Sequence, residues 1–437
     1  MRLIRLLKNE LAKEATDWVD KEIISAEQAE QICARYGIDF KNQSKRPLGY
    51  IVLISLGYLF IGLALITLLS ANWDEIPRST RMIGLVLLTL SVNLFALNKF
   101  KNGEKTSAIG YFFLGALFYG ASIMLIAQIY HIEEHYPDGI FWWAMGVLPI
   151  ALLLKSTLLM MLAMVLGFIW FFVEASLHYY PALFPVFLAA SAWHIIRAKQ
   201  SNILFLTFVA GLCFWAEYLL SWSLGNFQRF SFGADNISLV IGLFVLFHGC
   251  SRWLIGKKDT KLIDYGTLLS IWTLRFAIIT LLVFSFKEPW QELITANWEL
   301  PALTVALAIC MSSLAMWLVY TTDKIIFSTA IFSAMYLVSI ISAMLISDKS
   351  AGAIFQFADN IVLVASGIWL IILGIQNAIS HYFFLGVVVI LVTGFLRYID
   401  LFGDYIGATI LFAVCAVILL STAKFWKRQH SKARLET

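Results

Sequence analysis

The chain has 437 residues, of which 60% are hydrophobic and only 14% charged, and its formal net charge is +4. Soluble globular proteins carry about 25% charged residues, so this composition excludes that class and indicates a membrane protein. The bases are spread over many loops and form no patch, which argues against nucleic acid as a partner.

Residues 1–46 contain no membrane-length apolar run and form a unit of their own. Apolar residues at helical spacing, including Leu11 and Trp18, predict an amphipathic helix. Ser25 and Gln28 have the spacing of a capping box at the start of a second helix. We therefore expect a cytoplasmic helical hairpin that packs or docks a protein partner through its apolar stripe, with a sensor or regulatory role as the alternative.

Residues 47–426 are apolar runs separated by short loops, and roughly 20 helical residues cross a bilayer core. We predict an all-α polytopic transmembrane helix bundle of about fourteen spans, with about twelve as the alternative. The expected spans are 47–71, 80–97, 108–130, 139–154, 157–174, 181–196, 202–224, 237–256, 262–286, 300–320, 324–346, 358–377, 381–397 and 405–424. The fourth, sixth and thirteenth of these are short, and Lys155 with Ser156 is expected to form a turn because one helix there would exceed the bilayer.

Lys and Arg are concentrated in every second loop and in residues 427–437, which form a basic tail. The positive-inside rule then places both termini in the cytoplasm. Asp and Glu favour the other loops, so the outer face is expected to be electronegative. That face is either a solvated rim or a surface that concentrates cations.

The loop after the first span contains an outer-loop motif, Asn72, Trp73 and Asp74. A similar run, Asn297-Trp298-Glu299, precedes the tenth span. The two runs match either by chance or because the chain has an internal repeat of the transporter type.

The end of the third span is rich in polar groups. Gln128, His131 and His135 have the spacing of one helical face, so we expect the helix to continue through them and to end at Pro137.

Glu174 and His178 follow the fifth span on the same outer side. Together with the three residues before Pro137 they form a candidate outer-face polar cluster. Imidazole and carboxylate groups suit a metal ion or proton transfer. The alternative is a set of interfacial anchors and structural hydrogen-bonding groups.

Arg275 lies near the middle of the ninth span, where a charge is costly without a partner. We expect Glu217 to be that partner, with Asp359 as the second choice. Such a charge pair either fixes helix packing or borders a water-filled cavity that binds a substrate. His194 and His248 are expected to be hydrogen-bonded core groups.

Four parts of the chain resemble the bacterial DUF2157 predicted membrane proteins. They are the hairpin with Leu11, Trp18, residues 23–25 and Tyr36; the loop 71–77; residues 119–120 with 127–132; and residues 397–404. The resemblance is good through about residue 155 and implies a bacterial inner-membrane protein, but it assigns no activity and no catalytic residue. One departure is that Glu22 precedes Ile23 where the family often has Gly.

Three functions remain open. A carrier or channel for a small solute or ion is favoured, because many spans with short loops and buried polar groups leave room for a route between helices. A membrane-embedded enzyme would act on a lipid-linked or envelope substrate at the outer face. A scaffold would dock its partner through residues 1–46. The sequence leaves open whether the protein is an enzyme, and it specifies no catalytic residue, cofactor or metal.

Overall fold

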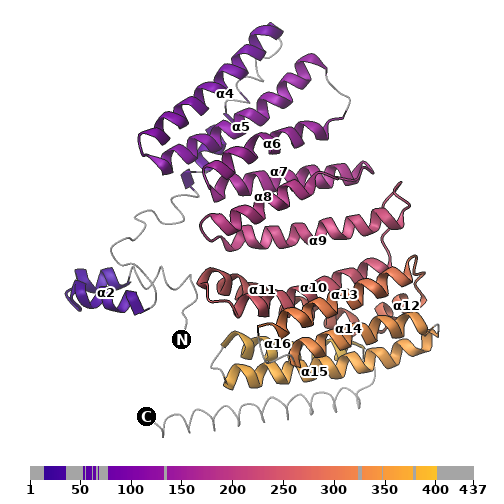
Figure 1. Ribbon diagram of the computed structural model, residues 1–437. Coiled ribbons are helices and arrows are strands. Elements are labelled where there is room, and N and C mark those ends of the chain that lie inside the picture. Colours follow the sequence, from indigo (N-terminus) through magenta and orange to yellow (C-terminus); the bar gives the residue numbers. More distant parts are fainter. Residues whose placement is uncertain are drawn as a thin grey trace. The chain divides into compact units, whose positions relative to one another are not determined.

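The computed structural model describes residues 14–35, 77–131, 135–322, 327–346, 348–376 and 380–400, with scattered residues between 53 and 67 (Figure 1). The described residues form helices joined by turns and loops, without a strand, which confirms the all-α class. The chain divides into two compact units, unit 1 (Met1–Gly139) and unit 2 (Ile140–Thr437). Four predictions lie wholly or largely outside the described residues: the first and last spans, the motif Asn72, Trp73 and Asp74, and the basic tail.

The start of unit 1 contains a helical segment, residues 14–20, followed by α2 (Ala26–Arg35). The capping box is confirmed, because Ser25 Oγ accepts the Gln28 N–H at 3.2 Å and Gln28 Oε1 accepts the Ser25 N–H at 2.9 Å. Ala15, Ala29 and Cys33 form the small buried core between the two segments.

The rest of unit 1 is built on α4 (Arg78–Lys101) and α5 (Lys105–Tyr130), which pack against each other. Thr89 Oγ1 and Ser122 Oγ are hydrogen-bonded across them at 3.0 Å. A Cβ atom at Gly115 would lie 2.7 Å from the Asn93 side chain, so glycine is needed at this approach.

Every expected span from the second to the thirteenth corresponds to one helix, and all but α4, α5 and the first turn of α6 (Pro137–Leu153) lie in unit 2. Those after α6 are α7 (Thr157–Ser176), α8 (Phe184–Arg197), α9 (Asn202–Leu224), α10 (Ala234–Ile255), α11 (Thr260–Phe284), α13 (Pro301–Tyr320), α14 (Phe327–Leu345), α15 (Gly352–Gln376) and α16 (Ser380–Asp400). Among the described residues ten helices are long and apolar enough to cross a membrane, and α6 and α8 are shorter, as expected for the fourth and sixth spans. The thirteenth, α16, is longer than predicted.

Unit 2 contains one predicted turn between helices and one helix that was not predicted. Lys155 has a φ of 48° and Ser156 caps α7 by accepting the Leu159 N–H, which confirms the predicted turn. The amphipathic helix α12 (Lys287–Thr295) was not predicted, since its apolar residues, with Trp290 and Leu293 buried, are too few for a span.

Hydrogen bonds between helix starts and neighbouring loops show which helix ends of unit 2 lie at the same end of the unit. Lys261 Nζ donates to the carbonyl oxygens of Ile196 and Ala198, which joins the α8–α9 loop to the start of α11. At the other end of α10, Asp235 accepts the N–H of Glu299, which joins the start of α10 to the residues before α13. Helices α9 and α11 therefore start at one end and α10 and α13 at the other, which is the alternation that membrane crossings show.

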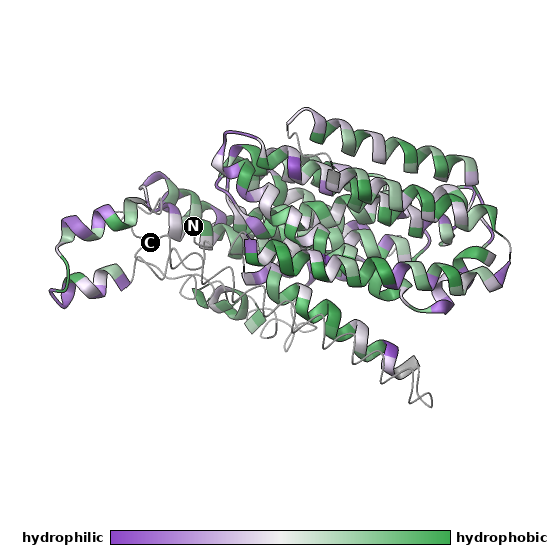
Figure 2. Ribbon diagram, turned by 90° about the horizontal axis from the view of Figure 1, so that it is seen from below, coloured by the Kyte–Doolittle hydropathy of each residue, from purple (hydrophilic) through white to green (hydrophobic). Residues whose placement is uncertain are grey.

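The two ends differ in charge, and hydrophilic residues gather there while hydrophobic residues run along the helices (Figure 2). The basic end carries Lys155, Arg197, Lys199, Lys257, Lys258 and Lys261. The other end, which we call the acidic end, carries Asp235, Glu288, Glu292, Glu299 and Asp348 against three bases, Arg229, Lys287 and Lys349. The hydroxyl and the N–H of Ser350 donate to Asp348 and hold the pKa of that carboxyl below its usual value, so it is charged at neutral pH.

Candidate functional site

The expected helical face of Gln128, His131 and His135 is wrong. Helix α5 ends at Tyr130, and His131 is its left-handed C-cap with a φ of 51°. Pro137 does not end this helix but begins α6. A proline is favourable in the first turn of a helix because the N–H that it lacks would have no partner there. Gln128 and His135 are therefore on different elements.

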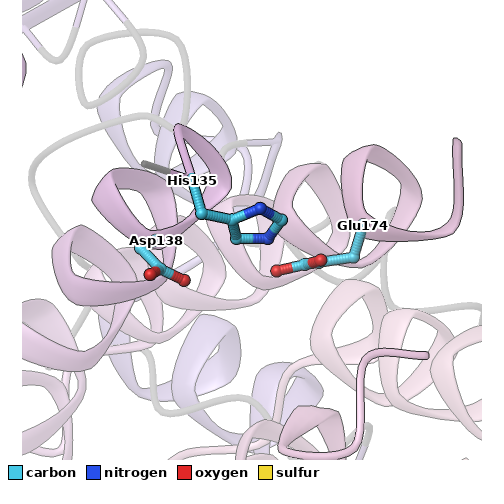
Figure 3. Close-up of side chains that lie close together, drawn as sticks. All are labelled: His135, Asp138 and Glu174. Carbon is cyan, nitrogen blue, oxygen red and sulfur yellow. The ribbon is translucent and has the colours of Figure 1, made fainter. Parts of the chain in front are cut away.

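His135 and Asp138 are adjacent at the start of α6, and each offers a ligand atom within 4.8 Å of the other. Figure 3 shows both side chains, together with Glu174 of α7. Glu174 is buried and accepts the Trp170 indole N–H at 3.0 Å. His178 lies beyond the end of α7 with a φ of 64°, so it does not share a helical turn with Glu174 as expected. The role of the outer-face cluster stays a prediction.

Glu217 and Arg275 have different neighbours. Glu217 Oε2 accepts the Asn236 side-chain N–H at 2.9 Å, near the acidic end. The Arg275 guanidinium lies over the Trp272 ring, 5.4 Å from its centre. No ion pair joins Arg275 to Glu217 or to Asp359 in the described part of the chain. Asp359 instead lies within the electrostatic influence of Arg397.

Helices α10, α13 and α14, which pack together, carry eight residues with buried polar atoms, and we call this set the polar row. It consists of Asp235, Ser238, His248, Thr304, Ser312, Thr329, Ser333 and Tyr336. All eight belong to unit 2.

The polar row begins at the acidic end with Asp235, whose side chain is 1% exposed. The carboxylate accepts the Thr304 hydroxyl and the Glu299 N–H. Both donors are neutral, and no base pairs with this carboxylate among the residues that the structure describes.

One turn further along α10, Ser238 and Tyr336 form the second layer of the row. Their hydroxyl oxygens are 3.0 Å apart, and the Tyr336 hydroxyl also donates to the Ser238 carbonyl at 2.8 Å. A Cβ atom at Gly242 would lie 2.7 Å from the Tyr336 oxygen, so the missing side chain makes room for the phenol.

The other members of the row are Ser312 of α13, Ser333 and Thr329 of α14, and His248 of α10. The hydroxyls of Ser312, Ser333 and Thr329 and the Nε2 atom of His248 are buried without a hydrogen-bond partner in the described residues. His248 was expected to be a hydrogen-bonded core group, but its ring instead meets the Phe332 ring edge-on, with centres 5.0 Å apart. At about 1.5 Å per residue, His248 lies roughly 20 Å from Asp235 along α10.

Sequence reasoning missed the row because single hydroxyl groups on apolar helices are common and usually bond to a carbonyl of their own helix. A usable signal is the spacing of Asp235, Ser238, Gly242 and Gly249, which places polar and small residues on one face of α10. Small residues at such a face mark close helix packing in membranes.

The family model described as "Predicted membrane protein (DUF2157)" matches residues 16–160. This confirms the resemblance over the first part of the chain. No curated protein and no solved structure matches. The polar row lies beyond the matched residues, so the family match bears on the class of protein and not on the row. The matched family and the membrane-length apolar helices lead to the same conclusion: the chain is a membrane protein.

Proposed function

We propose that the protein carries or conducts a small cation, protons included, across the bacterial inner membrane. The observation that supports this most is the polar row. Buried polar groups are costly in lipid and are found where ions or solutes pass. A carboxylate that is held by neutral donors, followed by unpartnered hydroxyls and an imidazole, offers acceptors to a cation at successive depths.

The charge distribution supports a cation in particular. The acidic end raises the local concentration of cations where Asp235 begins the row. We place this end on the outer side, and the basic end with both termini in the cytoplasm, by the positive-inside rule. The proposed architecture is fourteen spans that follow a cytoplasmic hairpin of residues 1–46.

The test is a flux assay on the full-length protein in liposomes. Vesicles with an internal pH dye, or with indicators for Na⁺ and K⁺, receive an imposed gradient of the ion. We expect faster flux than in empty vesicles, and a large reduction in Ser312→Val and Asp235→Asn. Thr207→Val is the matched control, because its hydroxyl donates to the Ile203 carbonyl of its own helix and lies outside the row.

Two results would contradict the proposal. One is the absence of proton, Na⁺ and K⁺ flux above the empty vesicles. The other is a flux that persists in Ser312→Val and Asp235→Asn when both variants elute and insert like the parent protein. A loss in His135→Ala with an intact row would favour the enzyme hypothesis at the outer face.

A further inference from the structure

We infer that Arg275 and His381 bind the phosphate of an anionic phospholipid at the membrane-facing surface of unit 2. The two side chains line one cavity of about 380 Å³ between α11 and α16. The remainder of its wall is almost wholly apolar and includes Leu274, Leu385 and Val388.

Within the described part of the chain, the cavity lies on an exposed apolar surface of α11 and α16. Both helices that form it are candidate spans. Phe384 is 63% exposed and Val388 is 52% exposed on α16, and Trp272 is also exposed on α11. Exposed apolar side chains on a spanning helix contact acyl chains, so a lipid is the molecule that reaches this cavity.

Arg275 requires an anion in this place. Its side chain is exposed near the middle of α11, where an unpaired charge is costly. Its contact with Trp272 leaves the guanidinium charge uncompensated, and no carboxylate pairs with it in the described part of the chain. The negative group that lipid molecules bring to a membrane surface is the headgroup phosphate.

The donors of the cavity suit a phosphate diester. A guanidinium presents parallel N–H groups that match two phosphate oxygens, and it is the preferred side chain for such recognition. His381 adds an imidazole N–H donor from α16. The apolar wall then accommodates the first part of an acyl chain, which a free phosphate ion lacks.

Arg275 lies near the middle of α11, deeper than lipid headgroups, so its side chain has to extend toward the basic end to reach the phosphate. α15 starts next to Asp348 at the acidic end and crosses to the other side, so α16 begins, with His381, toward the basic end. Bases at a membrane surface attract anionic lipids by about 1 kcal/mol each. The same lipids are therefore enriched near the cavity.

The test measures lipid binding to the full-length, delipidated protein in detergent by native mass spectrometry. The probes are phosphatidylglycerol and, with the same acyl chains, zwitterionic phosphatidylcholine. We expect preferential binding of phosphatidylglycerol, with affinity reduced roughly tenfold or more in Arg275→Gln. Arg197→Gln is the matched control, because it removes an exposed arginine of α8 that does not line the cavity.

A second variant tests the cavity without changing its charge. Val388→Trp fills the space and should also weaken the binding of phosphatidylglycerol. Equal binding of both lipids, or unchanged binding in Arg275→Gln and Val388→Trp, would overturn the inference. Displacement of the lipid by an equal concentration of inorganic phosphate would show a free-anion site and overturn the lipid assignment. Ion flux is measured separately, so this inference and the proposed transport function fail independently.

Discussion

Gly249 lies at a very close approach of α10 and α13, and Gly249→Ala tests that packing. A Cβ atom at this position would lie 2.7 Å from the Ala315 Cα atom and 2.8 Å from the Ala315 carbonyl oxygen. Ordinary contacts of this kind begin at 3.4 Å. The opposing atoms belong to a helix backbone and cannot rotate away, so the two helices must separate by several tenths of an ångström.

The magnitude follows from two opposing effects. Overpacking a close contact destabilises a protein by about 1–3 kcal/mol. Replacing Gly by Ala inside a helix stabilises it by about 1 kcal/mol. Because the clash at Gly249 is with backbone atoms, we expect the upper part of the first range and a net loss of roughly 2 kcal/mol. At a few degrees per kcal/mol, the Tm should fall by about 4 °C.

Gly84→Ala on α4 is the matched control, since a Cβ atom there would meet nothing within 4 Å. It receives the helix-propensity gain without the clash, so its Tm should stay level or rise. Both variants and the parent protein are compared by thermal unfolding in one detergent. A Gly249→Ala protein that is as stable as the Gly84→Ala protein would refute the close approach of α10 and α13.

Three further predictions test other parts of the chain. Thr304→Val should lower the free energy of unfolding by about 1.5–3 kcal/mol, because it removes a hydrogen bond to the buried carboxylate of the polar row, whereas Thr207→Val should have little effect. Urea titration in detergent measures both, and equal losses would contradict the role of the Thr304 hydroxyl. Glu22→Gly should stabilise the amino-terminal helices by about 0.5–1 kcal/mol, since Glu22 has a φ of 55°, and unchanged protease resistance would argue against this. Lys258→Cys should react with an impermeant maleimide only from the cytoplasmic side and Lys349→Cys only from the outside, and the reverse pattern would invert the proposed orientation.

Hydrophobic length and charge were enough to predict the described helices of membrane length. The run from 140 to 173 was divided correctly at Lys155 because a single helix would be too long for the bilayer. Only α12 was missed among the described helices of unit 2, since a short amphipathic helix at a membrane surface has no hydropathy signal of span length. Hydropathy predicts the elements well because lipid requires every crossing to be a helix.

Contacts between helices were much harder to predict. Arg275 and Glu217 were paired in the sequence analysis because opposite charges in a membrane need partners. Sequence does not specify which face of α11 meets which neighbour, and the structure gives Arg275 an exposed position beside His381. The prediction of one helical face through His131 was wrong for a local reason. His131 itself adopts the left-handed conformation that ends α5, and the sequence has no Gly or Asn there to indicate a helix end.

Charged residues within the helices of unit 2 differ in which groups surround them, and these groups decide whether a charge is left to attract a ligand. Asp359 is buried and lies within the electrostatic influence of Arg397, so it has a base in its surroundings that Asp235 lacks in the described residues. Asp235 is held by an N–H and a hydroxyl, so its charge is stabilised but still able to attract a cation. Arg275 is a positive charge that lacks a negative partner. The Trp272 ring lies beside it, and no carboxylate pairs with it in the described residues. One physical requirement, compensation of charge in a medium of low dielectric constant, therefore supports a cation route inside the bundle and an anionic lipid on its surface.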